Sequence, residues 1–206
     1  MIGIYGGTFD PIHYGHLRTA LEIKETFSLN EVRLIPCAQP AHRETPLTSP
    51  QMRLKMLELA VKNHQELVVD RRELDRTGFS YMIDTLKSLR NENTSHPLLL
   101  IIGTDAFQGL ESWHQWQNLF DYAHIIVITR PNYQHQELSD FLTSKLTKNK
   151  DKLKFKLSGN LFFQSVTQFD ISASMIRDTI KKGLNPAFLL PNRVIEYIKL
   201  NQLYKE

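Results

Sequence analysis

The chain has 206 residues, of which 41% are hydrophobic and 23% are charged, and its formal net charge at pH 7 is +3. This length and composition are ordinary for one globular domain with a buried core. The net charge is too small to indicate nucleic-acid binding, and it is compatible with an anionic small-molecule substrate.

The sequence carries no pattern typical of export or membrane insertion. Its single cysteine, Cys37, cannot form a disulfide within the chain, which favours a reducing compartment. The longest apolar run, residues 98–102, has the length of a strand and not of a membrane helix. Glycines and Asp10 interrupt the segment where a signal peptide would be apolar. We therefore expect a cytoplasmic protein that binds neither membranes nor nucleic acids.

The first part of the chain alternates between strand and helix patterns. The apolar run at residues 2–5 predicts a buried strand, and the apolar spacing over residues 14–27 predicts a helix. Residues 32–36 predict a second strand, which a loop rich in Pro, Ala and His follows. Ser49 and Pro50 have the order of an N-cap and a first helical residue, so we expect a helix to begin there.

The middle of the chain continues the alternation. Residues 67–70 predict a third strand, and Ser80 is placed to cap a helix whose apolar residues follow at helical spacing. Residues 98–102 and 125–129 are continuous apolar runs, which are typical of strands covered on both faces in a parallel sheet.

The last part begins with a polar, lysine-rich stretch at residues 131–156, for which we expect a solvated surface helix and loop. Residues 161–170 return to a strand pattern. Two helices are expected to close the chain, one over residues 172–182 that ends at Gly183, and one over residues 191–202.

These elements predict an α/β fold. Strands separated by helices of about a dozen residues indicate βαβ units with right-handed crossovers. We expect a Rossmann-like, doubly wound parallel sheet with the first strand at its centre. One domain would span residues 1–206, with a small C-terminal helical part over residues 171–206.

The stretch GGTFDPIHYGH, residues 6–16, is the first candidate for chemistry. Gly6 and Gly7 come where a strand hands over to a helix, and glycine there permits positive φ and close approach of a ligand. Helix N-terminal amides attract phosphate, and open α/β sheets bind ligands at the carboxyl ends of their strands. The stretch matches neither the dinucleotide fingerprint nor the P-loop, so a glycine corner with nothing bound stays open as an alternative.

His13 and His16 are three residues apart, so at a helix start they face the same ligand. A zinc site would need further ligands, and the only cysteine is Cys37, so phosphate contact is the favoured hypothesis. Asp10 has three interpretations: a cap of the following turn, a partner that orients a histidine, or a ribose contact. The Asp-Pro dipeptide favours the turn.

The same stretch resembles the G-x-F-D-x-x-H-x-G-H signature of the nucleotidyltransferase superfamily related to class I aminoacyl-tRNA synthetases. ISASMIR, residues 171–177, resembles the second signature of that superfamily. Along nearly its whole length the chain is similar to the bacterial nicotinate-nucleotide adenylyltransferases, for example in IIGTDAF and SWHQW. The resemblance implies that ATP and nicotinate mononucleotide react to give deamido-NAD and pyrophosphate, in the biosynthesis of NAD.

That reaction calls for cations and hydrogen-bond donors, because its nucleophile is a phosphate oxygen that is already ionised. The resemblance implies that His16 contacts the α-phosphate with His13 nearby, and that Ser172 and Arg177 hold the β- and γ-phosphates. Mg²⁺ is expected to accompany ATP. His13, His16 and Arg177 would be the catalytic residues. The implied ATP-binding residues are Gly6, Gly7, Thr8, Phe9, His13, His16, Asp105, Ile171, Ser172 and Arg177.

For the mononucleotide, the resemblance implies that Trp113 stacks on the ring and that Arg130 meets the phosphate; core packing of Trp113 is the alternative. Met82 stands where the family commonly has threonine, so only backbone donors remain at that position for the carboxylate. The implied mononucleotide-binding residues are His42, Arg43, Ser80, Tyr81, Met82, Trp113 and Arg130.

Other functions remain open at this point. One is dual use of nicotinate and nicotinamide mononucleotides, and another is a related transfer, as in phosphopantetheine adenylyltransferase or glycerol-phosphate cytidylyltransferase, which share only the two signatures. A synthetase-like tRNA-binding protein would need a further loop and an anticodon-binding domain, and a nucleotide-binding sensor would lack turnover. We expect a monomer or a homodimer.

Overall fold

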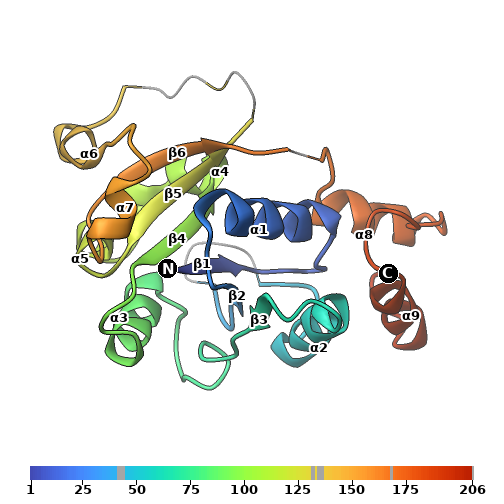
Figure 1. The fold of residues 1–206 in the computed structure, drawn as a ribbon. Helices are drawn as coiled ribbons and strands as arrows, with labels where there is room; N and C mark the ends of the chain where they lie inside the picture. The colour runs from blue at the N-terminus through green and yellow to red at the C-terminus, as the bar shows by residue number, and fades with distance from the viewer. Residues whose placement is uncertain (41–44, 131–132, 134–136, 168, 206) are drawn as a thin grey trace.

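The computed structural model describes residues 1–40, 45–130, 133, 137–167 and 169–205. Six parallel strands form one sheet with the order β3-β2-β1-β4-β5-β6 (Figure 1). This order is typical of a doubly wound Rossmann-like sheet and confirms the predicted fold class, with β1 paired on both sides. The strands are β1 (Ile2–Gly7), β2 (Glu31–Pro36), β3 (Leu67–Val69), β4 (Leu98–Gly103), β5 (His124–Thr129) and β6 (Leu161–Ser165).

Helices cover both faces of the sheet and divide the core into two clusters (Figure 1). One cluster joins the sheet to α1, α2, α8 and α9, and the other joins it to α3, α4 and α5. The helices are α1 (Tyr14–Phe27), α2 (Pro50–Val61), α3 (Met82–Glu92), α4 (Thr104–Gln108), α5 (Leu119–Tyr122), α6 (Asp140–Lys145), α7 (Lys152–Phe155), α8 (Ala173–Lys181) and α9 (Asn192–Leu200), with 3-10 turns η1 (Leu110–Ser112) and η2 (Trp116–Asn118).

The two central apolar runs are buried on both faces, as their composition predicts. In β4, Leu99 and Ile101 face the cluster of α1, whereas Leu98, Leu100 and Ile102 face the cluster of α3. This alternation follows from the two-residue period of a strand. No helix among the described residues is long and apolar enough to cross a membrane.

Local capping signals predict several boundaries correctly. Helix α1 has the predicted bounds, and the Ser49 hydroxyl accepts the Met52 N–H at 3.3 Å, so it caps α2. Ser172 caps α8 in the same way by accepting the Met175 N–H at 3.1 Å. Gly183 follows α8 with φ +69, a conformation that glycine adopts without a side-chain clash.

Two boundary predictions are wrong, and long-range hydrogen bonds explain both. Ser80 does not cap α3, because its hydroxyl accepts the N–H groups of Ala38 and Gln39 at 3.0 and 3.3 Å. Strand β6 ends at Ser165 and not at residue 170. There the chain leaves the sheet, and the Thr167 N–H donates to a carboxylate oxygen of Glu22 on α1 at 2.9 Å.

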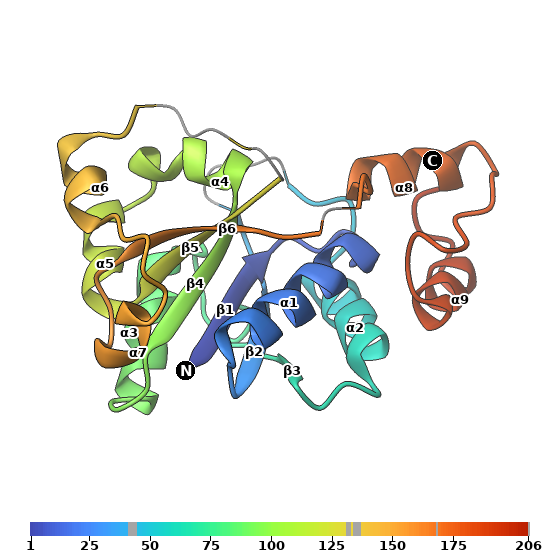
Figure 2. The same cartoon turned by 45° about the horizontal axis from the view of Figure 1, so that its top comes forward.

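The C-terminal helices α8 and α9 pack in the same core cluster as α1, near the start of the chain. After β6 the chain crosses the molecule, and α8 and α9 lie on the side of α1 and α2, away from β6 (Figure 2). Ile176 of α8 and Val194 and Ile198 of α9 are buried in the same cluster as α1. The second signature therefore reaches the carboxyl end of β1, next to the first.

Replacing Gly3 tests the packing of the core on the α1 face of β1. A Cβ at Gly3 would lie 2.9 Å from Leu29 Cδ1, 3.0 Å from Val32 Cγ2 and 3.2 Å from Ile101 Cδ1. We expect Gly3→Ala to lower the free energy of unfolding by about 1–3 kcal/mol, measured by urea denaturation, because overpacking forces neighbours to shift.

The matched control is Gly103→Ala at the end of β4, where a Cβ would meet no heavy atom of the described chain within 4 Å. We expect this change to alter stability by less than about 0.5 kcal/mol. Equal losses from the two substitutions would contradict the packing described for Gly3.

Candidate functional site

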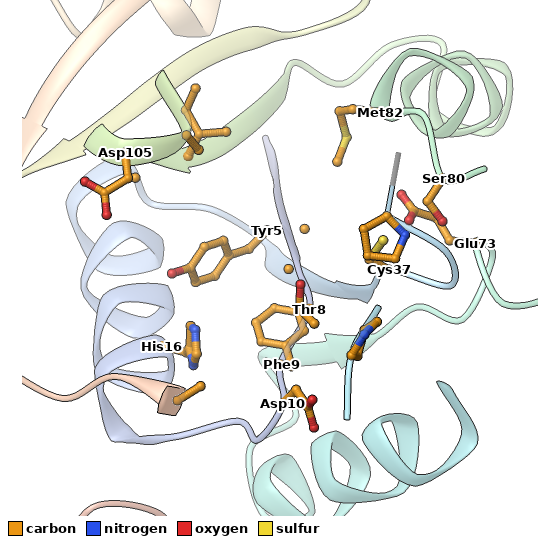
Figure 3. A pocket seen from close by; sticks show the side chains of 18 of the residues that line it. Tyr5, Thr8, Phe9, Asp10, His16, Cys37, Glu73, Ser80, Met82 and Asp105 are labelled. Carbon is orange, nitrogen blue, oxygen red and sulfur yellow. The ribbon is translucent and has the colours of Figure 1, made fainter. Parts of the chain in front are cut away.

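A cavity of about 1030 Å³ opens at the carboxyl ends of β1, β2 and β4. The connections that follow β1 and β4 leave toward opposite faces of the sheet, and ligands of doubly wound folds bind at such a switch point. Figure 3 shows Tyr5, His16 and Asp105 on one side of this cavity and Glu73, Ser80 and Met82 on the other. Its volume is at the upper end of the range of about 300–1000 Å³ that small-molecule sites occupy.

The two histidines of the first signature stack on one another at the start of α1. Their ring centroids are 3.7 Å apart, and Phe9 and Tyr5 pack against the His16 ring with centroids at 5.1 and 6.3 Å. Burial lowers the pKa of His13 to about 4. Burial, and then the neighbouring His13, hold the pKa of His16 well below its ordinary value. Both imidazoles are therefore neutral at pH 7.

The Nδ1 atoms of His13 and His16 are buried, and neither has a hydrogen-bond partner in the described part of the chain. A buried polar atom without a partner is costly, so a ligand that supplies one would bind favourably. His16 lines the cavity, whereas His13 is the N-cap residue of α1 and lies behind it at 5% exposure. The pair is thus placed to contact an anion through His16.

Asp10 joins three distant segments beneath the cavity. It is 4% exposed, and its carboxylate accepts the Leu47 N–H at 2.9 Å, the Thr48 hydroxyl at 2.6 Å and the Tyr204 hydroxyl at 2.5 Å. None of these contacts is among the three interpretations that the sequence offered, of which it favoured the turn. These bonds tie the loop before α2 and the C-terminus to Asp10, which also lines the cavity.

Arg177 connects α8 to Asp10 at the cavity. Its Nη1 donates to the Asp10 carbonyl oxygen at 2.7 Å, and the residue lines the cavity. The two signatures therefore meet, as the sequence predicts. Ser172 caps α8 in an exposed position, and the Ile171 carbonyl oxygen faces Gly15 of α1.

Arg53 of α2 hydrogen-bonds the two loops that follow β1 and β2. Its side chain is fully buried, and it donates to the carbonyl oxygens of Thr8 at 2.7 Å, Ala38 at 3.3 Å and Thr48 at 3.4 Å. Sequence reasoning missed this residue. An arginine on the otherwise apolar face of α2 was the signal that could have found it, because a buried guanidinium must be hydrogen-bonded.

The two glycines of the first signature serve packing. Gly6 and Gly7 belong to β1, and neither has the positive φ that the sequence suggested, which Phe9 has instead at 50°. A Cβ at Gly6 would lie 2.7 Å from Met82 Cε, and one at Gly7 would lie 2.9 Å from the Phe9 ring. The glycines therefore leave room for these two side chains at the cavity.

The opposite wall of the cavity is aromatic and carries a helix start. Trp113, Tyr81 and His114 line it, and the rings of the last two have centroids 4.5 Å apart. Helix α3 begins at Met82 without a side-chain cap. The first amides of a helix carry partial positive charge, so this wall suits an aromatic ring that bears a carboxylate.

Most of the predicted site residues come together. Among the described residues, those that line the cavity are Gly6, Gly7, Thr8, Phe9, His16, Ser80, Tyr81, Met82, Asp105, Trp113 and Arg177, and those that do not are His13, Arg130, Ile171 and Ser172. Arg130 is exposed at the end of β5. His42 and Arg43 lie outside the described residues.

The cavity also includes Tyr5, Cys37 and Glu73, which sequence reasoning did not select. Cys37 follows β2, and its place at the carboxyl end of a predicted strand was a usable signal. Glu73 stands in a run of charged residues that looks like a solvated surface, so no sequence pattern indicates its burial. The described residues contain no group of three or more His, Cys, Asp or Glu side chains that could hold a metal ion.

Comparison with known proteins places this site in a family. The family model described as cytidylyltransferase-like matches residues 4–179. The chain belongs to the cytidylyltransferase-like family. A Methylococcus capsulatus protein described as "probable nicotinate-nucleotide adenylyltransferase" is 46% identical over 99% of both chains, and a Pseudomonas aeruginosa protein with the same description is 43% identical over 99% of this chain and 97% of its own.

Solved structures show the same fold. The Plasmodium falciparum nicotinic acid mononucleotide adenylyltransferase complexed with NaAD has a TM-score of 0.73 at 19% identity, covering 98% of this chain and 96% of that one. The structure of the same enzyme complexed with APC has a TM-score of 0.72 at 20% identity, with the same coverage. The relatives at 43–46% identity confirm the sequence resemblance to the nicotinate-nucleotide adenylyltransferases over nearly the whole chain.

The buried His13 makes the stability of this cytidylyltransferase-like protein depend on pH. Its pKa is about 4 in the folded state against 6.5 for a free side chain, so the unfolded state binds more protons between these values. Stability is therefore lost as pH falls from about 6.5 toward 4, by about 3 kcal/mol in total for this group. Urea denaturation at pH 7, 6 and 5 measures the slope.

His13→Asn provides the comparison, because asparagine keeps an N-cap side chain without titrating in this range. We expect a shallower loss of stability between pH 7 and 5 in this variant than in the wild type. Identical slopes would mean that His13 is not held neutral by burial.

Proposed function

We propose that this protein transfers the adenylyl group of ATP to nicotinate mononucleotide, giving deamido-NAD and pyrophosphate in NAD biosynthesis. The observation that carries the proposal is that one cavity joins a phosphate-binding end, with His16 and Arg177, to an aromatic end, with Trp113 and the uncapped start of α3. The names of the close relatives and the NaAD and APC complexes of the structural neighbours support it.

The reaction needs positioning and charge stabilisation more than proton transfer. A phosphate oxygen of the mononucleotide forms a bond to the α-phosphorus, and the bond from that phosphorus to the bridging oxygen of pyrophosphate breaks. The neutral imidazole of His16 donates an N–H toward the α-phosphoryl oxygens, where negative charge is stabilised in the transition state. Arg177, with Ser172 at the start of α8, holds the β- and γ-phosphates, and His13 supports His16 from behind.

The other substrate occupies the aromatic wall. The nicotinate ring stacks on Trp113, and its carboxylate accepts hydrogen bonds from backbone amides at the start of α3, around Met82. Asp105, just after β4, contacts a ribose. Arg130, His42 and Arg43 would approach the mononucleotide from the rim of the cavity and contact its phosphate.

Mg²⁺ enters with ATP. The nucleotide's phosphates would hold it, with no ligand required from the described side chains. The Asp10 carboxylate is already used by three donors within the protein, which fits an ion that the nucleotide carries. When bound, Mg²⁺ neutralises charge on the departing pyrophosphate.

We further propose that the chain works as a single domain in the cytoplasm, as a monomer or a homodimer, with no nucleic-acid partner. A second candidate function is dual use of nicotinate and nicotinamide mononucleotides. The Met82 thioether in the cavity wall favours it, because this side chain offers no strong donor to distinguish a carboxylate from an amide.

Release of pyrophosphate from ATP and Mg²⁺ tests the proposal. We expect rapid release with nicotinate mononucleotide and a kcat/KM lower by about tenfold or more with nicotinamide mononucleotide, since only the acid complements the amides of α3. No release with either substrate would contradict the function, and equal rates would establish the dual specificity.

Replacing His16 tests its role in the transition state. We expect His16→Ala to lower kcat by about 10²–10³-fold, because it removes a donor aimed at developing charge. The dissociation constant of ATP, measured by calorimetry, should change much less.

His64→Ala is the matched control, since His64 is exposed and does not line the cavity among the described residues. This variant should keep wild-type kcat. An unchanged kcat in His16→Ala would rule out the proposed role of His16.

A further inference from the structure

Glu73 is a buried acidic group in the cavity wall that the mechanism above does not use. It lies in the turn between β3 and α3 and is 4% exposed. A buried carboxyl group is costly unless hydrogen bonds satisfy it. Its presence beside the substrate site therefore needs a reason in the structure.

The Thr85 hydroxyl of α3 holds Glu73, and Ser80 lies beside the same carboxyl group (Figure 3). The Thr85 hydroxyl, which is fully buried, donates to Glu73 Oε1 at 2.7 Å. Burial raises the pKa of Glu73, whereas hydrogen bonds from Thr85 and Ser80 lower it. The Glu73 carboxyl group is therefore hydrogen-bonded to Thr85 and lies next to Ser80 (Figure 3).

Ser80 extends this network to the segment that follows β2. Its hydroxyl oxygen accepts the N–H groups of Ala38 and Gln39, and its own N–H donates to the Gln39 carbonyl oxygen at 2.9 Å. Glu73 therefore connects three segments of the cavity wall: its own turn, α3 through Thr85, and residues 38–40 through Ser80.

The network encloses the first turn of α3. Tyr81 and Met82, which line the cavity, lie between Ser80 and Thr85 in the sequence. Glu73 accepts the Thr85 hydroxyl and lies beside Ser80. Arg76 Nη2 adds a long contact to the Tyr81 carbonyl oxygen at 3.4 Å. The first turn of α3 is thus held through residues on either side of it.

We propose that Glu73 is a positioning residue for the mononucleotide, fixing Ser80 and Thr85 so that the amides of the first turn of α3 point at the substrate carboxylate. The inference rests on the proposed function. It assigns to Glu73 a larger effect on the mononucleotide than on ATP, because the phosphate-binding end is built on α1, α8 and Asp10 and meets this network only indirectly, through Arg53. A merely structural role would affect both substrates or stability alone.

Steady-state kinetics with each substrate varied in turn test the proposal. We expect Glu73→Ala to raise the KM for nicotinate mononucleotide about tenfold or more, with the KM for ATP within about twofold of wild type, since misplacing a positioning group weakens the contacts that it aligns. Glu73→Gln should recover much of the loss, because the carboxamide oxygen can still accept the Thr85 hydroxyl.

Asp75→Ala is the matched control. Asp75 lies two residues away in the same turn, its side chain is 53% exposed, and it pairs with Arg71. Both KM values should stay at wild-type levels in this variant, and thermal melting of each variant reports on folding.

Thr85→Val is a second variant that keeps the test decisive if Glu73→Ala fails to fold. It removes the donor to Glu73 with little change of shape, and it should produce the same selective rise in the KM for the mononucleotide. Unchanged KM values, or an equal rise for both substrates, in the variants that fold would overturn the proposal for Glu73. Wild-type protein that releases no pyrophosphate would overturn the proposed function itself, and this inference with it.

Discussion

The arrangement of the site depends on the carboxylate of Asp10 at the end of β1. It accepts hydrogen bonds from Leu47 and Thr48 in the loop before α2 and from Tyr204 near the C-terminus, and its carbonyl oxygen accepts from Arg177. These partners lie between 37 and 194 residues away in the sequence. Because a buried hydrogen-bond network is strong only when every member is satisfied, this carboxylate couples the order of the cavity to the folding of both ends of the chain.

Near Asp10, the side chains of Arg53 and His13 and the Nδ1 atom of His16 are buried and held in fixed positions. Arg53 fixes three carbonyl groups in the two loops that follow β1 and β2, and the stacked histidines are held neutral among aromatic rings. Where burial excludes water, a donor aimed at a phosphate is worth more than the same donor in water. At the other end, the uncapped start of α3 supplies amides in place of a charged side chain. A cavity with these two ends suits two anionic nucleotides that must be brought into line.

The sequence predicted what depends on local chemistry. Continuous apolar runs located β4 and β5, and serine caps located the starts of α2 and α8. It failed where a side chain finds its partner far along the chain. The Ser80 hydroxyl binds the segment after β2, Glu73 is buried among hydroxyl groups, and Asp10 meets Tyr204, so single-sequence patterns contained no sign of these contacts. The resemblance to known motifs selected most of the residues that line the cavity, but it did not indicate which residues hold them in place.

A crystal structure of this protein with deamido-NAD would show whether one cavity takes both nucleotides in a fixed direction. We expect the nicotinate ring against Trp113, its carboxylate at the first amides of α3, and the phosphate of the adenylyl half within hydrogen-bond distance of His16. A dinucleotide bound in the reverse direction, or outside the cavity, would contradict this expectation.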